Sequence, residues 1–162
     1  MDHIYESPDI AKPYHYTMQP TPGLILKIKS TGGYLQPPRF GDTGFDLSSA
    51  DPLPIILKAK NYITVPTGIC VELPKGYDAQ VRPRSGLASR GIMASLGTID
   101  NSYRGEIKVV LFNFSDSDFI INLGDRIAQL VISRVYIPET VEQEAPLSVT
   151  ERGDRGFGST GI

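Results

Sequence analysis

The sequence predicts an all-β fold of the antiparallel sandwich or jelly-roll type. Between residues 24 and 137 the 162-residue chain consists of short apolar stretches that are rich in β-branched residues. Gly, Pro, Asn and Asp interrupt these stretches about every eight to twelve residues, a spacing typical of such folds. Only residues 85–95 have the composition of a short helix.

The expected strands follow one another along this region. The first, at 23–30, alternates apolar and polar residues, as a strand with one buried face does. The second, at 62–74, is rich in β-branched residues and is interrupted by Pro66 and Gly68. Four later stretches have the same composition and are expected to be strands: 77–83, 106–115, 118–123 and 126–137.

The chain divides into three parts. Residues 1–22 contain four prolines and no apolar period, so we expect a disordered or extended leader. Residues 23–137 form the β domain, and the polar, Pro/Gly-rich residues 138–162 form an arm that leaves it. The only histidines, His3 and His15, lie in the leader, so phosphoryl or acyl chemistry in this chain would have to use carboxylates.

Composition and charge exclude several functional classes. The formal net charge is −2, so no direct nucleic-acid partner is expected. No apolar run approaches the roughly 20 residues that span a bilayer, and the acidic residues 1–10 resemble neither a signal nor a transit peptide. The single cysteine, Cys70, cannot form an internal disulfide, and its apolar surroundings predict a buried hydrophobe. We therefore expect a soluble protein with no membrane partner, in the cytoplasm or another intracellular compartment.

Five polar stretches break the strand pattern, at 41–50, 82–91, 97–106, 122–131 and 152–162. Each places polar or charged residues beside glycine, and each taken alone has a purely structural interpretation. In that interpretation Asp46 is a turn or capping residue, Asp100 a turn former, Asp125–Arg126 a surface hairpin pair, Arg84 and Ser85 a loop ion pair and cap, and Tyr103 a core residue.

Taken together, the same stretches have the groups that phosphate chemistry requires. Phosphate recognition uses Arg guanidinium groups, hydroxyls and free backbone N–H groups. Metal-assisted hydrolysis of a phosphoanhydride also needs carboxylates, one to activate water and others to organise a hard cation. Asp100 and Asp46 are the candidate carboxylates. The phosphate-binding candidates are Arg84, Ser85 and Gly86 in one loop, and Arg152, Gly158, Ser159 and Thr160 near the end of the chain.

In this order, the five stretches resemble the five motifs of the trimeric dUTP pyrophosphatases (dUTPases). The matching segments are TGFDLSSA, RPRSGLA, GTIDNSYRGE, GDRIAQLV and RGDRGFGSTG, and the resemblance covers residues 24–162. It implies a jelly-roll-like β-barrel that forms a homotrimer with a swapped C-terminal arm and active sites between subunits. It implies hydrolysis of dUTP to dUMP and pyrophosphate, which limits uracil incorporation into DNA and supplies dUMP for thymidylate synthesis.

The resemblance also implies roles for individual residues. Asp100 would position and deprotonate the water that attacks the α-phosphorus, and Tyr103 would pack under the deoxyribose and exclude a 2′-OH. Mg2+ would be held mainly by the triphosphate, with no direct protein ligand and at most a water between it and Asp46. The other implied site residues are Gly97, Thr98 and Ile99 for uracil, Arg84, Ser85 and Gly86 of a neighbouring subunit for phosphate, and Gln129 with Asp46 for water and metal.

The arm would close over the site of another subunit. Arg152, Ser159 and Thr160 would hold the γ-phosphate, Phe157 would stack on uracil, and glycines such as Gly158 would let the backbone approach the phosphates. Three features depart from the usual family pattern. They are Arg155 in place of a glycine, Phe45 in place of a frequent tyrosine, and a short connection between the second and third motifs.

The residues alone leave three other interpretations of the protein's function open. A dCTP deaminase would share the fold, but it does not usually carry the GFGSTG arm. A binding or regulatory trimer would keep the nucleotide pocket without needing Asp100 as a base. A structural jelly-roll trimer would leave Phe157 and the terminal glycines unexplained.

Overall fold

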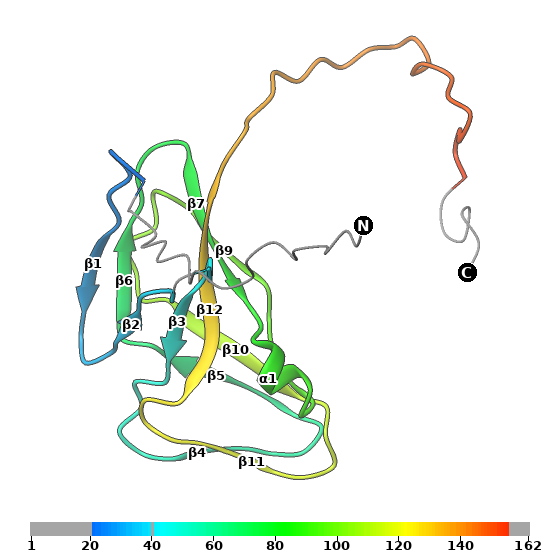
Figure 1. Ribbon diagram of the computed structural model, residues 1–162. Helices are drawn as coiled ribbons and strands as arrows, with labels where there is room; N and C mark the ends of the chain where they lie inside the picture. Colours follow the sequence, from blue (N-terminus) through cyan, green and yellow to red (C-terminus); the bar gives the residue numbers. More distant parts are fainter. Residues whose placement is uncertain (1–20, 40, 156–162) are drawn as a thin grey trace, which may run out of the picture.

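The computed structural model describes residues 21–39 and 41–155, which form twelve strands and one short helix (Figure 1). The predicted all-β class is thus confirmed, and the helix lies in the stretch expected to hold one. The strands are β1 (Lys27–Ser30), β2 (Leu35–Gln36), β3 (Phe45–Ser48), β4 (Ile55–Leu57), β5 (Tyr62–Pro66), β6 (Ile69–Glu72), β7 (Tyr77–Arg82), β8 (Ile92–Ala94), β9 (Gly97–Ile99), β10 (Lys108–Asn113), β11 (Phe119–Ile121) and β12 (Arg126–Arg134), and the helix is α1 (Ser85–Ala88).

The strands form four antiparallel sheets rather than a closed barrel, at least within the described residues. The largest has the order β2-β3-β12-β7-β9, a second has the order β5-β10-β8, and β1-β6 and β11-β4 are two-stranded. Pro37 and Pro38 follow β2 directly, and because proline has no backbone N–H, β2 pairs over only two residues. The prediction of a closed barrel is therefore wrong for the described residues, whose strands form separate open sheets.

The core contains residues from both larger sheets. In β10 the alternating residues Val109, Leu111 and Asn113 are buried, and in β7 Ala79 and Val81 are buried in the same way. This alternation is the period of two of a strand with one buried face. Cys70 differs from the prediction, because it is half-buried rather than part of the core.

After β12 the chain leaves the sheets. Residues 135–155 contain no strand, and their side chains, including Val141, Leu147 and Val149, are exposed. In Figure 1 this segment, drawn in orange to red, runs away from the body of the molecule. The predicted leader lies almost entirely outside the described residues, as do Phe157, Gly158, Ser159 and Thr160.

The helix content also bears on membrane insertion. In the part of the chain that the structure describes, no helix has the length and apolar character needed to cross a membrane.

Candidate active site

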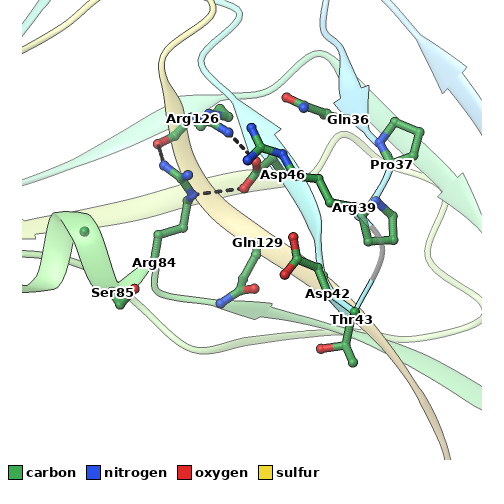
Figure 2. Close-up of a pocket in the computed structure, with 14 residues that line it drawn as sticks. Gln36, Pro37, Arg39, Asp42, Thr43, Asp46, Arg84, Ser85, Arg126 and Gln129 are labelled. Carbon is green, nitrogen blue, oxygen red and sulfur yellow. Dashed lines mark hydrogen bonds and ion pairs between the residues drawn. The ribbon is translucent and has the colours of Figure 1, made fainter. Parts of the chain in front are cut away.

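The first candidate pocket is centred on Asp46, and we call it the Asp46 pocket. It has a volume of about 480 Å³ and lies where the β2–β3 loop, β3, β12 and the loop from β7 to α1 meet (Figure 2). It contains five of the predicted site residues, together with several that the sequence did not single out. Its lining includes Asp46, Arg84, Ser85, Gly86 and Gln129, and also Gln36, Arg39, Asp42, Thr43, Gly44 and Arg126.

Asp46 is held between two guanidinium groups. Arg84 Nε lies 2.9 Å from Asp46 Oδ1, and Arg126 Nη1 lies 3.0 Å from Oδ2. Arg84 also donates from Nη1 to the backbone carbonyl of Arg126 at 3.0 Å. These charge-assisted contacts fix both arginines at one wall of the pocket, where their remaining N–H groups can bind an anion.

The structural interpretations of Asp46 and of the Asp125–Arg126 pair are wrong, whereas the ion pair expected for Arg84 is present, with Asp46 as its partner. Asp46 lies within β3 rather than in a turn or a cap. Arg126 pairs with Asp46 and not with its neighbour Asp125, whose Oδ2 instead accepts from the backbone N–H of Asn122 at 2.7 Å. Arg126 is therefore a pocket residue that the sequence analysis missed.

A β-bulge in β12 decides which side chains enter the Asp46 pocket. Arg126 pairs with Ser48 but Ala128 pairs with Leu47, so one extra residue is inserted between them. The insertion brings Gln129, rather than Ala128, opposite Asp46. Without it, an alanine would face the carboxylate.

Gln129 is fixed from two sides. Its Nε2 donates to the Pro83 carbonyl at 2.9 Å, so it also holds the loop that carries Arg84. A Cβ on Gly44 would lie 2.5 Å from Gln129 Oε1, so this side-chain position requires glycine at residue 44. By contrast, a Cβ on Gly86 would meet nothing within 4 Å, which leaves the backbone there open to a ligand.

The second candidate pocket, which we call the Asp100 pocket, is also about 480 Å³. In the described chain, β9 pairs only with β7, so the other edge of β9 presents free backbone N–H and C=O groups. Such an edge can hydrogen-bond the edge of a planar polar ligand. The lining residues are Thr98, Ile99, Asp100, Tyr103, Glu106, Ile107 and Lys108, and the predicted Gly97 begins β9 beside them.

The turn after β9 places Asp100 and Tyr103 together. The Tyr103 N–H donates to the Asp100 carbonyl at 3.0 Å, and Tyr103 Oη donates to the Glu106 carbonyl at 3.0 Å. Tyr103 is 44% exposed, so it is not a core residue. A Cβ on Gly105 would collide with the Tyr103 ring, which makes glycine necessary for this ring position. The backbone contact agrees with the proposed turn, and Asp100 is one of the residues that line the pocket.

The two pockets lie at opposite ends of β7. Ile99 pairs with Ala79, which places Asp100 at the level of Asp78, whereas Arg84 follows the other end of the strand. Six residues of extended chain span roughly 20 Å. The pockets share no lining residue, so a single chain does not bring Asp100 together with Arg84.

Metal-ligating groups are sparse in this region. Among residues 21–39 and 41–155, no three His, Cys, Asp or Glu side chains form a cluster that could hold a metal ion. Asp42 and Asp46 both line the Asp46 pocket. Mg2+ typically binds one or two carboxylates plus substrate phosphates, so this donor set fits a cation that arrives with a polyphosphate.

Comparisons with known proteins point to one family. The family model described as dUTPase matches residues 32–161. The deoxyuridine 5'-triphosphate nucleotidohydrolase of Hydrogenobaculum sp. is 50% identical over 142 residues, which cover 86% of this chain and 97% of that protein. The corresponding protein of Neorickettsia sennetsu is 49% identical over 136 residues, covering 80% of this chain and 91% of its own length.

Solved structures agree with this result. The dUTPase of Staphylococcus bacteriophage 80alpha with dUPNHPP has a TM-score of 0.77 and 28% identity, covering 85% of this chain and 99% of its own. A mutant dUTPase from phage phi11 of S. aureus, which coordinates a structural Mg(II) ion, shares the fold at a TM-score of 0.69 and 23% identity, covering 76% of this chain and 99% of its own. The chain belongs to the dUTPase family.

Proposed function

We propose that the protein hydrolyses dUTP to dUMP and pyrophosphate, thereby limiting uracil incorporation into DNA and supplying dUMP for thymidylate synthesis. The observation that carries this proposal is the Asp100 pocket, where a free strand edge leads directly to a carboxylate and an exposed aromatic ring. A free backbone edge suits uracil, the ring suits a deoxyribose, and the carboxylate suits a catalytic base.

In the proposed mechanism, the Asp100 carboxylate orients a water molecule and accepts its proton as the water oxygen attacks the α-phosphorus. The bond from the α-phosphorus to the bridging oxygen of the β-phosphate then breaks, and pyrophosphate leaves. Arg84, Ser85 and Gly86 bind the phosphates, while Asp46 holds the Arg84 guanidinium in place. Gln129 orders water on the same side, and Gly97, Thr98 and Ile99 read uracil.

Mg2+ is the proposed cofactor. When bound to the triphosphate it neutralises charge that develops on the phosphate oxygens. The chain would contribute Asp46, whose carboxylate has lone pairs beyond those used by its two arginine contacts. One of these lone pairs could accept a hydrogen bond from a water molecule bound to Mg2+. Arg84 and Arg126 keep that carboxylate oriented toward the phosphates.

We further propose that the enzyme is a homotrimer with a barrel-like subunit of residues 23–137 and a swapped arm of residues 138–162. The separation of Asp100 from Arg84 supports this proposal, because a triphosphate is much shorter than roughly 20 Å and one nucleotide must contact both. Two chains can supply the two halves. The arm would add a third chain's Arg152, Phe157, Gly158, Ser159 and Thr160, and its exposed apolar residues suit burial on another subunit.

A substrate comparison tests the proposed function. With Mg2+ present, we expect pyrophosphate release from dUTP and little release from dTTP, dCTP or UTP. The products should be assayed for pyrophosphate and for ammonia with each nucleotide. Ammonia from dCTP would instead indicate a deaminase, and nucleotide binding without any product would indicate a binding protein.

A complementation experiment tests the shared site. Asp100→Asn and a chain ending at Glu151 should each be inactive, but mixed trimers can combine an intact Asp100 with an intact arm. Coexpression should therefore restore part of the dUTPase activity. A chain that carries both changes, coexpressed with Asp100→Asn, is the matched control and should stay inactive. Inactivity of verified mixed trimers would mean that each arm serves its own subunit.

A further inference from the structure

Two arginines are held together in a compact turn of the arm. Arg152 Nε donates to the Arg155 carbonyl at 3.0 Å, and Arg155 Nε donates to the Arg152 carbonyl at 3.0 Å. A further hydrogen bond from Arg155 Nη2 reaches the Glu151 carbonyl. The turn begins with Gly153, whose N–H donates to the Thr150 carbonyl at 3.1 Å and whose φ is +58°.

The backbone of Arg155 itself is unstrained. Lys60 is the one non-glycine residue with a positive φ in the described ranges, so Arg155 does not occupy the left-handed region that would require glycine. The left-handed conformation of this turn falls on Gly153 instead. An arginine at residue 155 is therefore compatible with the path of the arm.

Among the described residues, the guanidinium groups of this turn form no ion pair. Both arginines are exposed, and in the described part of the chain neither lies within 4 Å of a carboxylate oxygen, although Glu151 and Asp154 are sequence neighbours. Among the described residues, Arg152 donates from Nε and Arg155 from Nε and Nη2, so both have further N–H groups for a ligand. Two adjacent cations repel each other, and a polyvalent anion between them would relieve that repulsion.

We propose that Arg155 is a second phosphate-binding residue of the arm, which acts with Arg152 on the terminal phosphate and favours triphosphates over shorter nucleotides. The proposal rests on the proposed function, because it requires the arm to close over a bound nucleotide. The reciprocal Nε contacts tie each arginine side chain to the backbone of the other before the ligand arrives. Such pre-organisation reduces the conformational entropy lost on binding.

Affinity measurements with nucleotides of different phosphate number test this role. In the full-length enzyme with Mg2+, Arg155→Gly should weaken binding of dUpNHpp about tenfold, the typical effect of losing a hydrogen bond to a charged group. Its affinity for dUDP and dUMP should change less than about twofold. With dUTP, KM should rise while kcat stays nearly constant, because the lost contact binds the ground state and transition state alike.

Matched variants separate a phosphate contact from a purely structural role. Asp154→Gly introduces the same backbone freedom at the adjacent residue without removing a guanidinium group. It should not reduce the preference for dUpNHpp over dUDP and dUMP. Arg155→Lys should recover part of the loss. In about 1 M salt, where the Debye length falls to about 3 Å, Arg155→Gly and the unaltered enzyme should approach the same affinity.

Two outcomes would overturn the inference while leaving dUTP hydrolysis intact. One is an equal loss of affinity for all three nucleotides that persists in high salt, which would assign Arg155 to the fold of the turn. The other is an unchanged affinity for dUpNHpp in Arg155→Gly. Absence of dUTP hydrolysis by the unaltered enzyme would instead contradict the proposed function itself.

Discussion

Asp100→Asn is expected to lower kcat for dUTP by about 10²–10⁴-fold, the usual cost of losing a general base. The amide cannot accept the proton of the attacking water at neutral pH. No histidine lies among the described residues to take over, because both histidines of the chain precede residue 21. The loss should therefore appear in kcat and not mainly in KM.

The fold should tolerate this change. Asp100 contributes its backbone carbonyl to the turn with Tyr103, and the described residues provide no hydrogen-bond donor to its carboxylate within the protein. Asparagine has nearly the same size and keeps the backbone contact. Calorimetry with dUpNHpp should therefore give an affinity close to that of the unaltered enzyme, and the thermal midpoint should change little.

Asp116→Asn is the matched control for the Asp100 variant. It makes the same chemical change at a side chain that is 92% exposed and forms an ion pair with Lys60. Lys60 lowers the pKa of Asp116, so the pair is intact at neutral pH, but exposed pairs contribute little to stability or function. Activity near that of the unaltered enzyme is expected for this control. The same result for Asp100→Asn would remove Asp100 from the mechanism.

The sequence predicted the long strands better than the short ones. The predicted stretches at 77–83, 106–115 and 126–137 correspond to β7, β10 and β12. The stretch at 62–74 divides into β5 and β6 at the Pro66–Gly68 interruption. The short strands β1 and β11 lie within the predicted stretches 23–30 and 118–123, but β2, β3, β4, β8 and β9 were not predicted as strands. Two to four residues show little period, and the conformation of such strands depends on pairing with distant strands.

The candidate site shows a similar limit. Composition singled out Asp46 and Arg84, and the family resemblance implied Gln129. No local pattern could indicate that Arg126 joins them, since its contact with Asp46 spans 80 residues of sequence. The bulge between Arg126 and Ala128 also could not be predicted from the sequence, although it determines that Gln129 faces Asp46. Residue types can thus be predicted locally, whereas their grouping follows from long-range register.

The second large effect that we expect is discrimination against the ribose of UTP. UTP should be rejected relative to dUTP by about 10²-fold or more in kcat/KM, the discrimination expected when an apolar surface meets an added hydroxyl. Tyr103 would supply it, because its ring is held in place by the hydrogen bond from Oη to the Glu106 carbonyl and by close contact with Gly105. Tyr103→Ala should open space for a 2′-OH and reduce the discrimination strongly.

Two further variants separate the ring from its hydroxyl. Tyr103→Phe keeps the ring and loses only the contact with the Glu106 carbonyl, so most of the discrimination should remain. Gly105→Ala keeps Tyr103 but adds a Cβ that collides with its ring, so it should displace the ring and admit UTP as Tyr103→Ala does. The measurement is kcat/KM for dUTP and UTP in all three variants. Unchanged discrimination in Tyr103→Ala, with dUTP turnover retained, would show that the 2′-OH is excluded elsewhere, and the steric role of Tyr103 would have to be abandoned.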